Sequence, residues 1–126
     1  MIRKPQSRQE KNDFRDFVLL QLGNMPGLKC RAMFSGHGLW ASGTFFGILY
    51  HGKLFFRTGP ETLSRYLDAG MGPFNPSPDL ISKNYYEAPP DVLASGAMLK
   101  EWAELAVEEA LKVKKKPKRP RRRKAT

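Results

Sequence analysis

The strongest constraint on the fold is a series of short apolar and aromatic segments that glycines interrupt between residues 28 and 58. These segments lie at residues 31–34, 39–41, 44–50 and 53–57. Candidate turns stand between them at Gly36-His37-Gly38, Ser42-Gly43 and His51-Gly52. Because such short connections join antiparallel neighbours, we predict a meander of strands in the middle of the chain.

The segment at 44–50 differs from the others in its pattern. Successive side chains of a strand point to opposite faces. Here apolar residues occupy both faces, at Phe45, Phe46, Ile48, Leu49 and Tyr50. We therefore expect a central strand, either with layers on both sides or with strong curvature.

A helix is expected before the meander. Ser7 and Glu10 have the spacing of a capping box. Apolar residues then recur at spacings of three and four, which gives one apolar stripe. Gly23 is placed to end the helix. These signals predict a helix over residues 8–22.

The region after the meander begins with a second capping-box spacing, at Thr58 and Glu61. We expect a short helix there, ended by Gly70. Residues 71–79 contain three prolines, so this stretch is expected to be a loop. Residues 80–87 then read as a further strand.

The last helix is expected to begin at Ser95, after Pro89-Pro90 has ended the preceding strand. Its acidic residues Glu101, Glu104 and Glu108 are expected to face solvent, and Glu108 can pair with Lys112. The inward face carries Leu99, Trp102, Ala103, Ala106 and Ala110.

The order of elements is α-β-β-β-β-α-β-α, which predicts an α+β fold with an antiparallel sheet of about five strands packed with helices. The length fits one domain. We expect a flexible N-terminus at 1–7, the folded domain at 8–112 and a disordered basic tail at 113–126. Pro117 prevents the last helix from continuing through the tail.

Charge is distributed very unevenly between the body and the tail. The chain has a formal net charge of +10, yet residues 1–111 hold 12 basic and 12 acidic residues. Residues 112–126 carry ten Lys or Arg and no acidic residue. A segment with this composition cannot fold alone. The body is electroneutral by count, so the basic character belongs to the tail.

The density of charge in the tail suits contacts with phosphates, and arginine is favoured toward its end. We expect it to bind DNA or RNA largely without sequence preference. Anionic lipid is a weaker candidate, because the tail lacks an apolar anchor. The expected nucleic-acid-binding residues are Lys114, Lys115, Lys116, Lys118, Arg119, Arg121, Arg122, Arg123 and Lys124.

Several other classes of protein do not fit the sequence. Cys30 is the single cysteine, so no intramolecular disulfide can form. With only His37 and His51 beside it, no usual zinc-ligand spacing exists, and we expect no metal or cofactor. No apolar run is long enough to span a bilayer, and no signal-peptide pattern is present. We expect a soluble, cytoplasmic protein without a membrane partner.

The sequence contains the run Arg31-Ala32-Met33-Phe34-Ser35-Gly36-His37-Gly38-Leu39-Trp40. This run is similar to the Arg-x-Met-Phe-Gly-Gly-x-Gly-Leu signature of the TfoX/Sxy family, in its N-terminal domain. Ser35 stands where glycine is common, and His37 where an aromatic residue is common. Further stretches fit over residues 47–57, 69–74, 85–89 and 99–103. The resemblance covers about residues 10–112.

The resemblance implies a compact α+β domain of the kind found at the front of bacterial competence regulators, with no known catalytic residues. Full-length regulators carry a second, helical domain after this one. Where that domain would follow, this sequence has the basic tail. The motif residues, expected to be structural, are Arg31, Met33, Phe34, Gly36, Gly38, Gly70, Tyr85, Tyr86, Pro89 and Trp102.

Candidate chemistry in the body has plainer explanations. The Gly36-His37-Gly38 run lacks the spacing of a phosphate-binding loop, and a tight hairpin turn accounts for it better. Cys30 fits an incidental cysteine at a strand start. Tyr85 and Glu87 are expected on one face of their strand and Tyr86 on the other.

One further alternative concerns the middle of the sheet. If they are exposed, Phe55 or Tyr50 beside Lys53 and Arg57 can stack nucleic-acid bases. The consensus spacing of the RNA-binding module is absent, and core packing is the plainer expectation.

Three functions remain open at this point. The first is a non-enzymatic binding and regulatory module that the tail attaches to nucleic acid. The second is an adaptor that docks a regulatory protein, with a tail that only improves solubility. The third is an enzyme, which requires His37, Cys30, Tyr85 or Glu87 to converge in one cleft.

Overall fold

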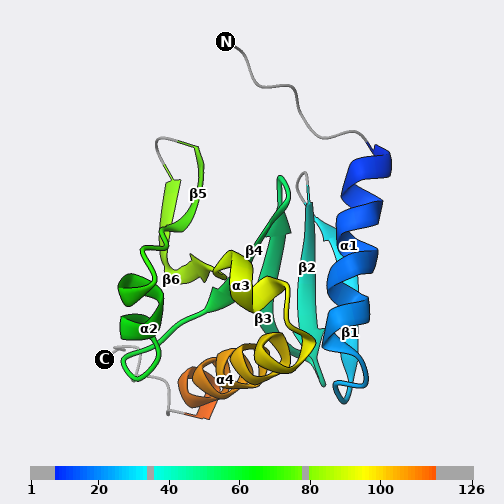
Figure 1. The fold of residues 1–126 in the computed structure, drawn as a ribbon. Coiled ribbons are helices and arrows are strands. Elements are labelled where there is room, and N and C mark those ends of the chain that lie inside the picture. The colour runs from blue at the N-terminus through cyan, green and yellow to red at the C-terminus, as the bar shows by residue number, and fades with distance from the viewer. Residues whose placement is uncertain (1–7, 34–35, 78–79, 116–126) are drawn as a thin grey trace, which may run out of the picture.

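The computed structural model describes residues 8–33, 36–77 and 80–115 of the 126-residue chain. Within these residues an antiparallel six-stranded sheet is packed with helices (Figure 1). The order of strands across the sheet is β1-β2-β3-β4-β6-β5. The elements are α1 (Arg8–Leu22), β1 (Leu28–Met33), β2 (Gly36–Ala41), β3 (Thr44–Tyr50), β4 (Lys53–Arg57), α2 (Leu63–Asp68), β5 (Pro73–Ser77), β6 (Leu80–Glu87), α3 (Pro90–Leu93) and α4 (Gly96–Lys115).

The α+β class and the central meander are confirmed. Helix α1 has the expected bounds, and strands β1 to β4 are joined in sequence as antiparallel neighbours. Both turns have positive φ at their two residues. The angles are 50° at Ser42 and 84° at Gly43, and 51° at His51 and 76° at Gly52. Two consecutive positive φ angles are the signature of a type I′ hairpin turn, which matches the twist of the flanking strands.

The turn expected at Gly36-His37-Gly38 is wrong. These residues open strand β2: all three pair with β1, and His37 and Gly38 also pair with β3. The connection between β1 and β2 includes residues 34–35, which lie outside the described residues. The two glycines serve close packing rather than a turn: a Cβ on Gly36 would overlap the backbone carbonyl oxygen of Leu49.

The loop expected at residues 71–79 is also wrong in part, because Pro73–Ser77 forms β5. Strand β5 is the last in the sheet order, so one of its sides has no neighbouring strand in the described part of the sheet. Proline lacks a backbone donor and is therefore tolerated on such an edge strand. The short helix α3, which begins at Pro90, was not expected either.

Helix α2 starts later than the capping-box spacing suggested. Its N-cap position is Thr62, whose side-chain oxygen accepts a hydrogen bond from the backbone N–H of Gly59 at 3.1 Å. Gly70 ends the helix as expected, with φ of 76°. The N–H of Met71 donates to the carbonyl of Tyr66 at 3.0 Å, and the N–H of Gly70 donates to that of Leu67 at 3.0 Å. This pair of bonds is a Schellman motif.

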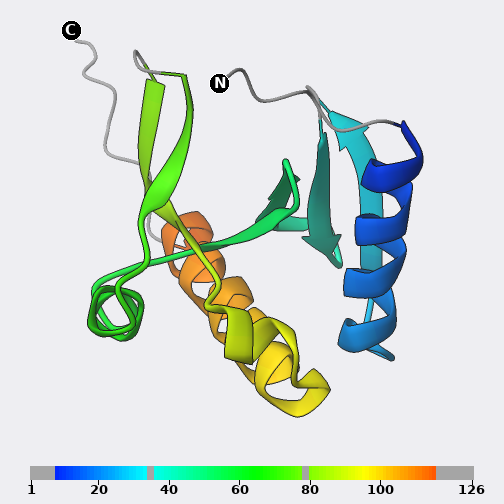
Figure 2. The same ribbon diagram turned by 45° about the horizontal axis from the view of Figure 1, so that its top comes forward.

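Helices α1 and α4 lie on the same face of the sheet (Figure 2). Alternating side chains of β2, β3 and β4 meet them there, so we call this the inner face. The expected inward residues of α4 are buried at Leu99, Ala103, Ala106 and Ala110, and Trp102 is half-buried. The inner core from the sheet consists of Leu39, Ala41, Phe46, Leu49, Leu54 and Phe56.

A bulge explains the apolar residues on both faces of β3. The register between β2 and β3 shifts between Leu39 and Trp40, which pair with Gly47 and Phe45. Phe46 is the extra residue, and its side chain joins the inner core. Phe45 and Ile48 belong to a separate cluster built from strands alone. Strand β3 thus has apolar clusters on both sides. This agrees with the first of the two expected alternatives, a central strand with layers on both sides.

The C-terminal part of α4 differs from expectation in its ion pairs. Lys112 does not pair with Glu108. Its Nζ lies 3.0 Å from a carboxylate oxygen of Glu109 and 3.0 Å from one of Glu61. The helix continues to Lys115, three residues beyond the expected end of the domain. Residues 116–126, which include Pro117, lie outside the described residues.

Candidate functional site

The face of the sheet opposite α1 and α4 gathers the aromatic and basic side chains that the sequence analysis singled out. We call it the outer face. Residues paired across antiparallel strands share a face. The register pairs Lys29 with Trp40 and Arg31 with Gly38. The rows continue across the sheet and include Met33, Gly36, Phe45, Ile48, Tyr50, Lys53, Phe55, Arg57, Tyr85 and Glu87.

Four of the family-motif residues lie on this face in β1 and β2. Arg31 is exposed, Met33 is half-buried, and Gly36 and Gly38 lie beside them. A Cβ on Gly38 would lie 2.6 Å from the sulfur of Met33 and 2.9 Å from ring atoms of Phe45. Glycine is therefore needed because neighbouring side chains cover the strand. Phe34 lies outside the described residues.

The aromatic side chains of the outer face form a connected layer. The ring centroids of Trp40 and Phe45 are 4.9 Å apart, and those of Phe45 and Tyr85 are 5.6 Å apart. Both pairs are tilted, a favourable arrangement for aromatic rings. Trp40 and Phe45 are half-buried, which leaves part of each ring in contact with solvent.

Arg57 lies at the end of this layer. Its guanidinium carbon is 5.8 Å from the ring centroid of Tyr85. Burial raises the pKa of Tyr85, and the charge of Arg57 and its hydrogen bond to the tyrosine oppose that shift. The Nε of Arg57 is buried without a hydrogen-bond partner among the described residues. A buried donor of this kind calls for an acceptor.

A hollow of about 320 Å³ adjoins Arg57 and Tyr85. Phe45 lines it from β3, and Ala110 and Val113 line it from the last turns of α4. The hollow therefore joins one corner of the outer face to the helix that leads into the tail.

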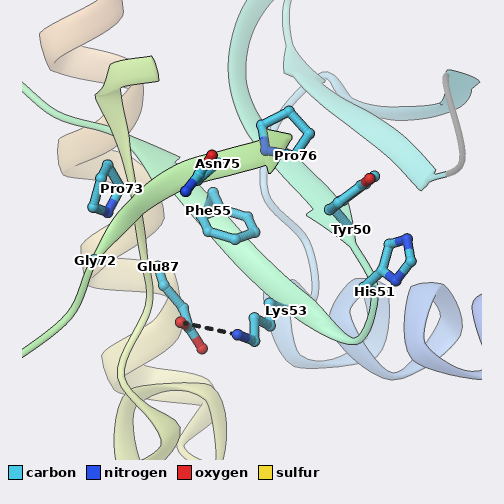
Figure 3. Close-up of a pocket in the computed structure, with 9 residues that line it drawn as sticks. All are labelled: Tyr50, His51, Lys53, Phe55, Gly72, Pro73, Asn75, Pro76 and Glu87. Atoms are coloured by element: carbon cyan, nitrogen blue, oxygen red, sulfur yellow. Dashed lines mark ion pairs between the residues drawn. The ribbon is translucent and has the colours of Figure 1, made fainter. Parts of the chain in front are cut away.

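A second hollow, of about 440 Å³, lies at the other end of the outer face (Figure 3). Tyr50, Lys53 and Glu87 line it from the sheet, and β5 closes one side. Lys53 and Glu87, which both line it, form an ion pair at 3.9 Å. With side chains 51% and 25% exposed, such a pair contributes at most about 1 kcal/mol to stability.

Cys30 and His37 lie on the inner face, opposite Tyr85 and Glu87. Cys30 pairs with Leu39 and His37 with Leu49, and both leucines belong to the inner core. Burial raises the pKa of the Cys30 thiol, which makes it a poorer nucleophile. The four candidate catalytic side chains therefore lie on two opposite faces of the sheet and do not meet in one cleft of the described residues.

Burial also lowers the pKa of His37 from its ordinary value of 6.5, and the charges of Arg15 and Lys11 add to this effect. The charge of Asp16 opposes it. An imidazole with a lowered pKa binds fewer protons in the folded chain than in the unfolded chain just below pH 6.5.

We therefore expect the free energy of unfolding to fall as the pH drops below about 6.5. Urea unfolding at several pH values measures this. The pH dependence should weaken in His37→Gln and persist in His51→Asn, where asparagine tolerates the positive φ. An equal pH dependence in wild type and His37→Gln would contradict the assignment.

The remaining described motif residues lie in or beside the packed elements. Trp102 packs edge-on against Tyr66, with ring centroids 4.8 Å apart. The ring centroids of Tyr66 and Tyr86 are 6.3 Å apart. Pro89 is the N-cap residue of α3. Tyr85 and Glu87 share the outer face while Tyr86 faces inward, as the alternation predicted.

Two of the expected nucleic-acid-binding residues, Lys114 and Lys115, form the end of α4. The others lie outside the described residues: Lys116, Lys118, Arg119, Arg121, Arg122, Arg123 and Lys124. Val113, which lines the hollow beside Arg57, precedes them directly.

Sequence reasoning missed one buried charge, Glu109, whose side chain is 4% exposed. Its carboxylate accepts a hydrogen bond from Lys112 at 3.0 Å and lies where a Cβ on Gly59 would stand. The signal was available, because Glu109 follows the inward residue Ala106 by three positions.

Two properties concern only residues 8–33, 36–77 and 80–115. None of their helices combines the length and apolarity that crossing a bilayer requires. Their His, Cys, Asp and Glu side chains form no group of three or more that could hold a metal ion.

Comparison with known proteins agrees with the motifs. The family model described as TfoX N-terminal domain matches residues 20–110, from within α1 to near the end of α4. No curated protein matches the chain. Since the match includes every described strand and more than half of the 126 residues, the chain belongs to the TfoX N-terminal domain family.

Proposed function

We propose that the protein is a non-enzymatic regulatory module whose basic tail attaches it to nucleic acid through phosphates. Membership of the family suggests a regulatory or competence-related domain, and the family is not known as enzymatic. The observation that carries the proposal is the charge distribution. Residues 112–126 hold ten basic residues and no acidic one, whereas the rest of the chain is balanced.

Counterion release gives this binding a measurable form. Each phosphate that a Lys or Arg neutralises releases condensed cations, so affinity falls as salt rises. If about six tail residues contact phosphates of a duplex, the slope of log affinity against log salt is about −5. Contacts of this kind carry no sequence information, so the protein binds unrelated sequences with similar affinity.

The test compares the wild-type chain with a variant in which the seven basic residues between 116 and 124 are replaced by glutamine. Fluorescence anisotropy with a labelled duplex at several salt concentrations reports affinity and slope. We expect the variant to bind at least about tenfold more weakly at 0.1 M salt, with a clearly shallower slope that reflects the remaining Lys114 and Lys115.

A matched control removes charge from the body instead. Lys83 and Lys100 are exposed, and replacing both by glutamine should leave the salt slope close to that of wild type. Equal affinity and equal slope in the wild type and the tail variant would refute the proposal.

A second candidate function, a protein-interaction adaptor, is favoured by one observation on α1. Phe17 and Leu20 are 42% and 79% exposed and lie three positions apart on the helix. Neighbouring exposed apolar side chains are typical of interaction surfaces. This candidate predicts that a regulatory protein partner is captured equally by wild type and the tail variant, and that Leu20→Glu abolishes the capture at high salt.

A further inference from the structure

We infer that the outer face binds single-stranded nucleic acid by stacking bases on its aromatic layer. The inference rests on the proposed function for the class of ligand and adds the strand state and the site. Proteins that bind single strands combine a positive surface that follows the backbone with aromatic side chains that stack bases. Both components are present on this face.

The charge of the outer face is complementary to a polyanion. Lys53 and Glu87 offset each other in an ion pair, which leaves the positive charges of Lys29, Arg31 and Arg57 in these rows. Lys29 and Arg31 are exposed on the first strand, and neither takes part in an ion pair with another described residue. They stand beside Trp40 and Gly38 in the register, so phosphates held by them place bases over Trp40.

A base can approach the half-buried rings of the outer face, which are Trp40, Phe45 and Tyr50. The cluster beside them, Ile48, Phe55, Phe74 and Tyr85, is buried and supports these rings. Gly38 lets the side chains of Met33, Phe45 and Trp40 pack directly on the strand. A duplex keeps its bases stacked inside and cannot use such a surface, so the face selects unpaired strands.

Arg57 gives the site a defined end. Its Nε is a buried donor without a partner among the described residues, and its guanidinium lies against Tyr85 beside the 320 Å³ hollow. Arg57 lines this hollow, so a phosphate or a base carbonyl bound there lies beside its positive charge.

The position of α4 links the face to the tail. Val113 lines the same hollow, and the described helix ends two residues later at Lys115. A tail that holds phosphates from this attachment point raises the effective concentration of the strand at the outer face. The tail therefore supplies general attraction, and the face supplies the preference for exposed bases.

The experiment uses the full chain and three labelled probes with equal phosphate numbers: a thymidine oligonucleotide of about 15 nucleotides, the same length of abasic strand, and a duplex. Anisotropy at fixed salt gives the affinities. We expect the thymidine strand to bind about tenfold more tightly than the abasic strand, because each base that stacks on an aromatic ring contributes to the binding free energy.

Trp40→Leu keeps an apolar side chain but removes the flat ring, and it should reduce the preference for thymidine over abasic strand at least about fivefold. Arg31→Gln changes an exposed residue and should weaken thymidine binding without affecting the fold. Phe17→Leu is the matched control, because it removes a 42% exposed aromatic ring from α1, and it should change nothing. Circular dichroism establishes that each variant is folded.

Fluorescence of the wild type gives an independent readout if Trp40→Leu fails to fold. Stacking on Trp40 should quench tryptophan emission with the thymidine strand and leave it unchanged with the abasic strand. The second tryptophan, Trp102, packs against Tyr66 on the helical side and is not expected to respond.

The outcomes separate the two proposals. Equal affinity of the wild type for thymidine and abasic strands overturns the outer-face inference, even if the salt slope shows that the tail binds. A preserved thymidine preference with no loss in the tail variant overturns the tail proposal and supports the face. A tail variant that loses affinity for all three probes by the same factor, with the preference intact, supports both.

Discussion

Replacing Phe56 by alanine should lower the free energy of unfolding by about 3–5 kcal/mol. Phe56 is fully buried in the inner core and stacks on Phe46 with ring centroids 6.2 Å apart. Helix α4 packs against this part of the sheet. Truncation therefore removes the transfer free energy of the ring and leaves a cavity that the helix and the neighbouring strands can fill only in part.

Urea titration monitored by circular dichroism measures the effect, provided that the slope of the unfolding free energy against urea concentration is similar in both proteins. Phe17→Ala is the matched control, since it is the same substitution at a position 42% exposed on α1. It should cost less than about 1 kcal/mol. Similar losses at the two positions would contradict the assignment of Phe56 to the core.

Replacing Gly36 by alanine should destabilise the fold by about 3 kcal/mol, the upper end of the usual cost of overpacking. The added Cβ would occupy the position of the Leu49 carbonyl oxygen. That oxygen belongs to the backbone of β3, so no change of rotamer can relieve the contact. Strands β2 and β3 must separate at the family signature.

Gly72→Ala provides the comparison, because a Cβ at Gly72 meets no atom within 4 Å. Gly72 has no positive φ, so we expect a change of less than about 1 kcal/mol, with the sign set by the unfolded chain. Differential scanning calorimetry of both variants checks the pair. A melting temperature for Gly36→Ala close to that of wild type would show that the strands can accommodate the methyl group.

Turn chemistry made much of the sheet predictable. Ser42-Gly43 and His51-Gly52 require positive φ at both residues, and few dipeptides supply this. The same reasoning failed at Gly36 and Gly38, because a glycine that permits close packing and a glycine that permits a turn look alike in sequence. Only the side chains of Met33, Phe45 and Trp40 above Gly38 distinguish the two cases.

Position within the sheet decided the other errors. Residues 71–79 contain three prolines, and proline is excluded from a strand that has neighbours on both sides. For a central strand, these prolines would rightly predict a loop. Strand β5 lies at an edge of the described sheet, which no local pattern of residues reveals. The N-cap of α2 is Thr62 rather than Thr58, and the hydroxyl of Thr62 accepts a hydrogen bond from the backbone N–H of Gly59.

The outer face was predictable in its parts but not as a surface. Alternation placed Tyr85 and Glu87 together. Stacking of bases on Phe55 or Tyr50 was an alternative to core packing, and Phe55 is indeed buried while Tyr50 is half-buried. Which face of the sheet the helices leave open depends on where α1 and α4 pack. That choice is made by contacts between elements distant in sequence.

The two sheet edges bear on how the protein behaves at high concentration. An edge strand with free backbone groups is a template for adding strands from other molecules. Two of the five residues of β5, Pro73 and Pro76, lack a backbone donor, which leaves this strand a poorer template for a newcomer. On β1, Lys29 and Arg31 are exposed, so two copies meeting edge to edge bring like charges together. The residues that attract a polyanion therefore also discourage the sheet from growing into fibrils.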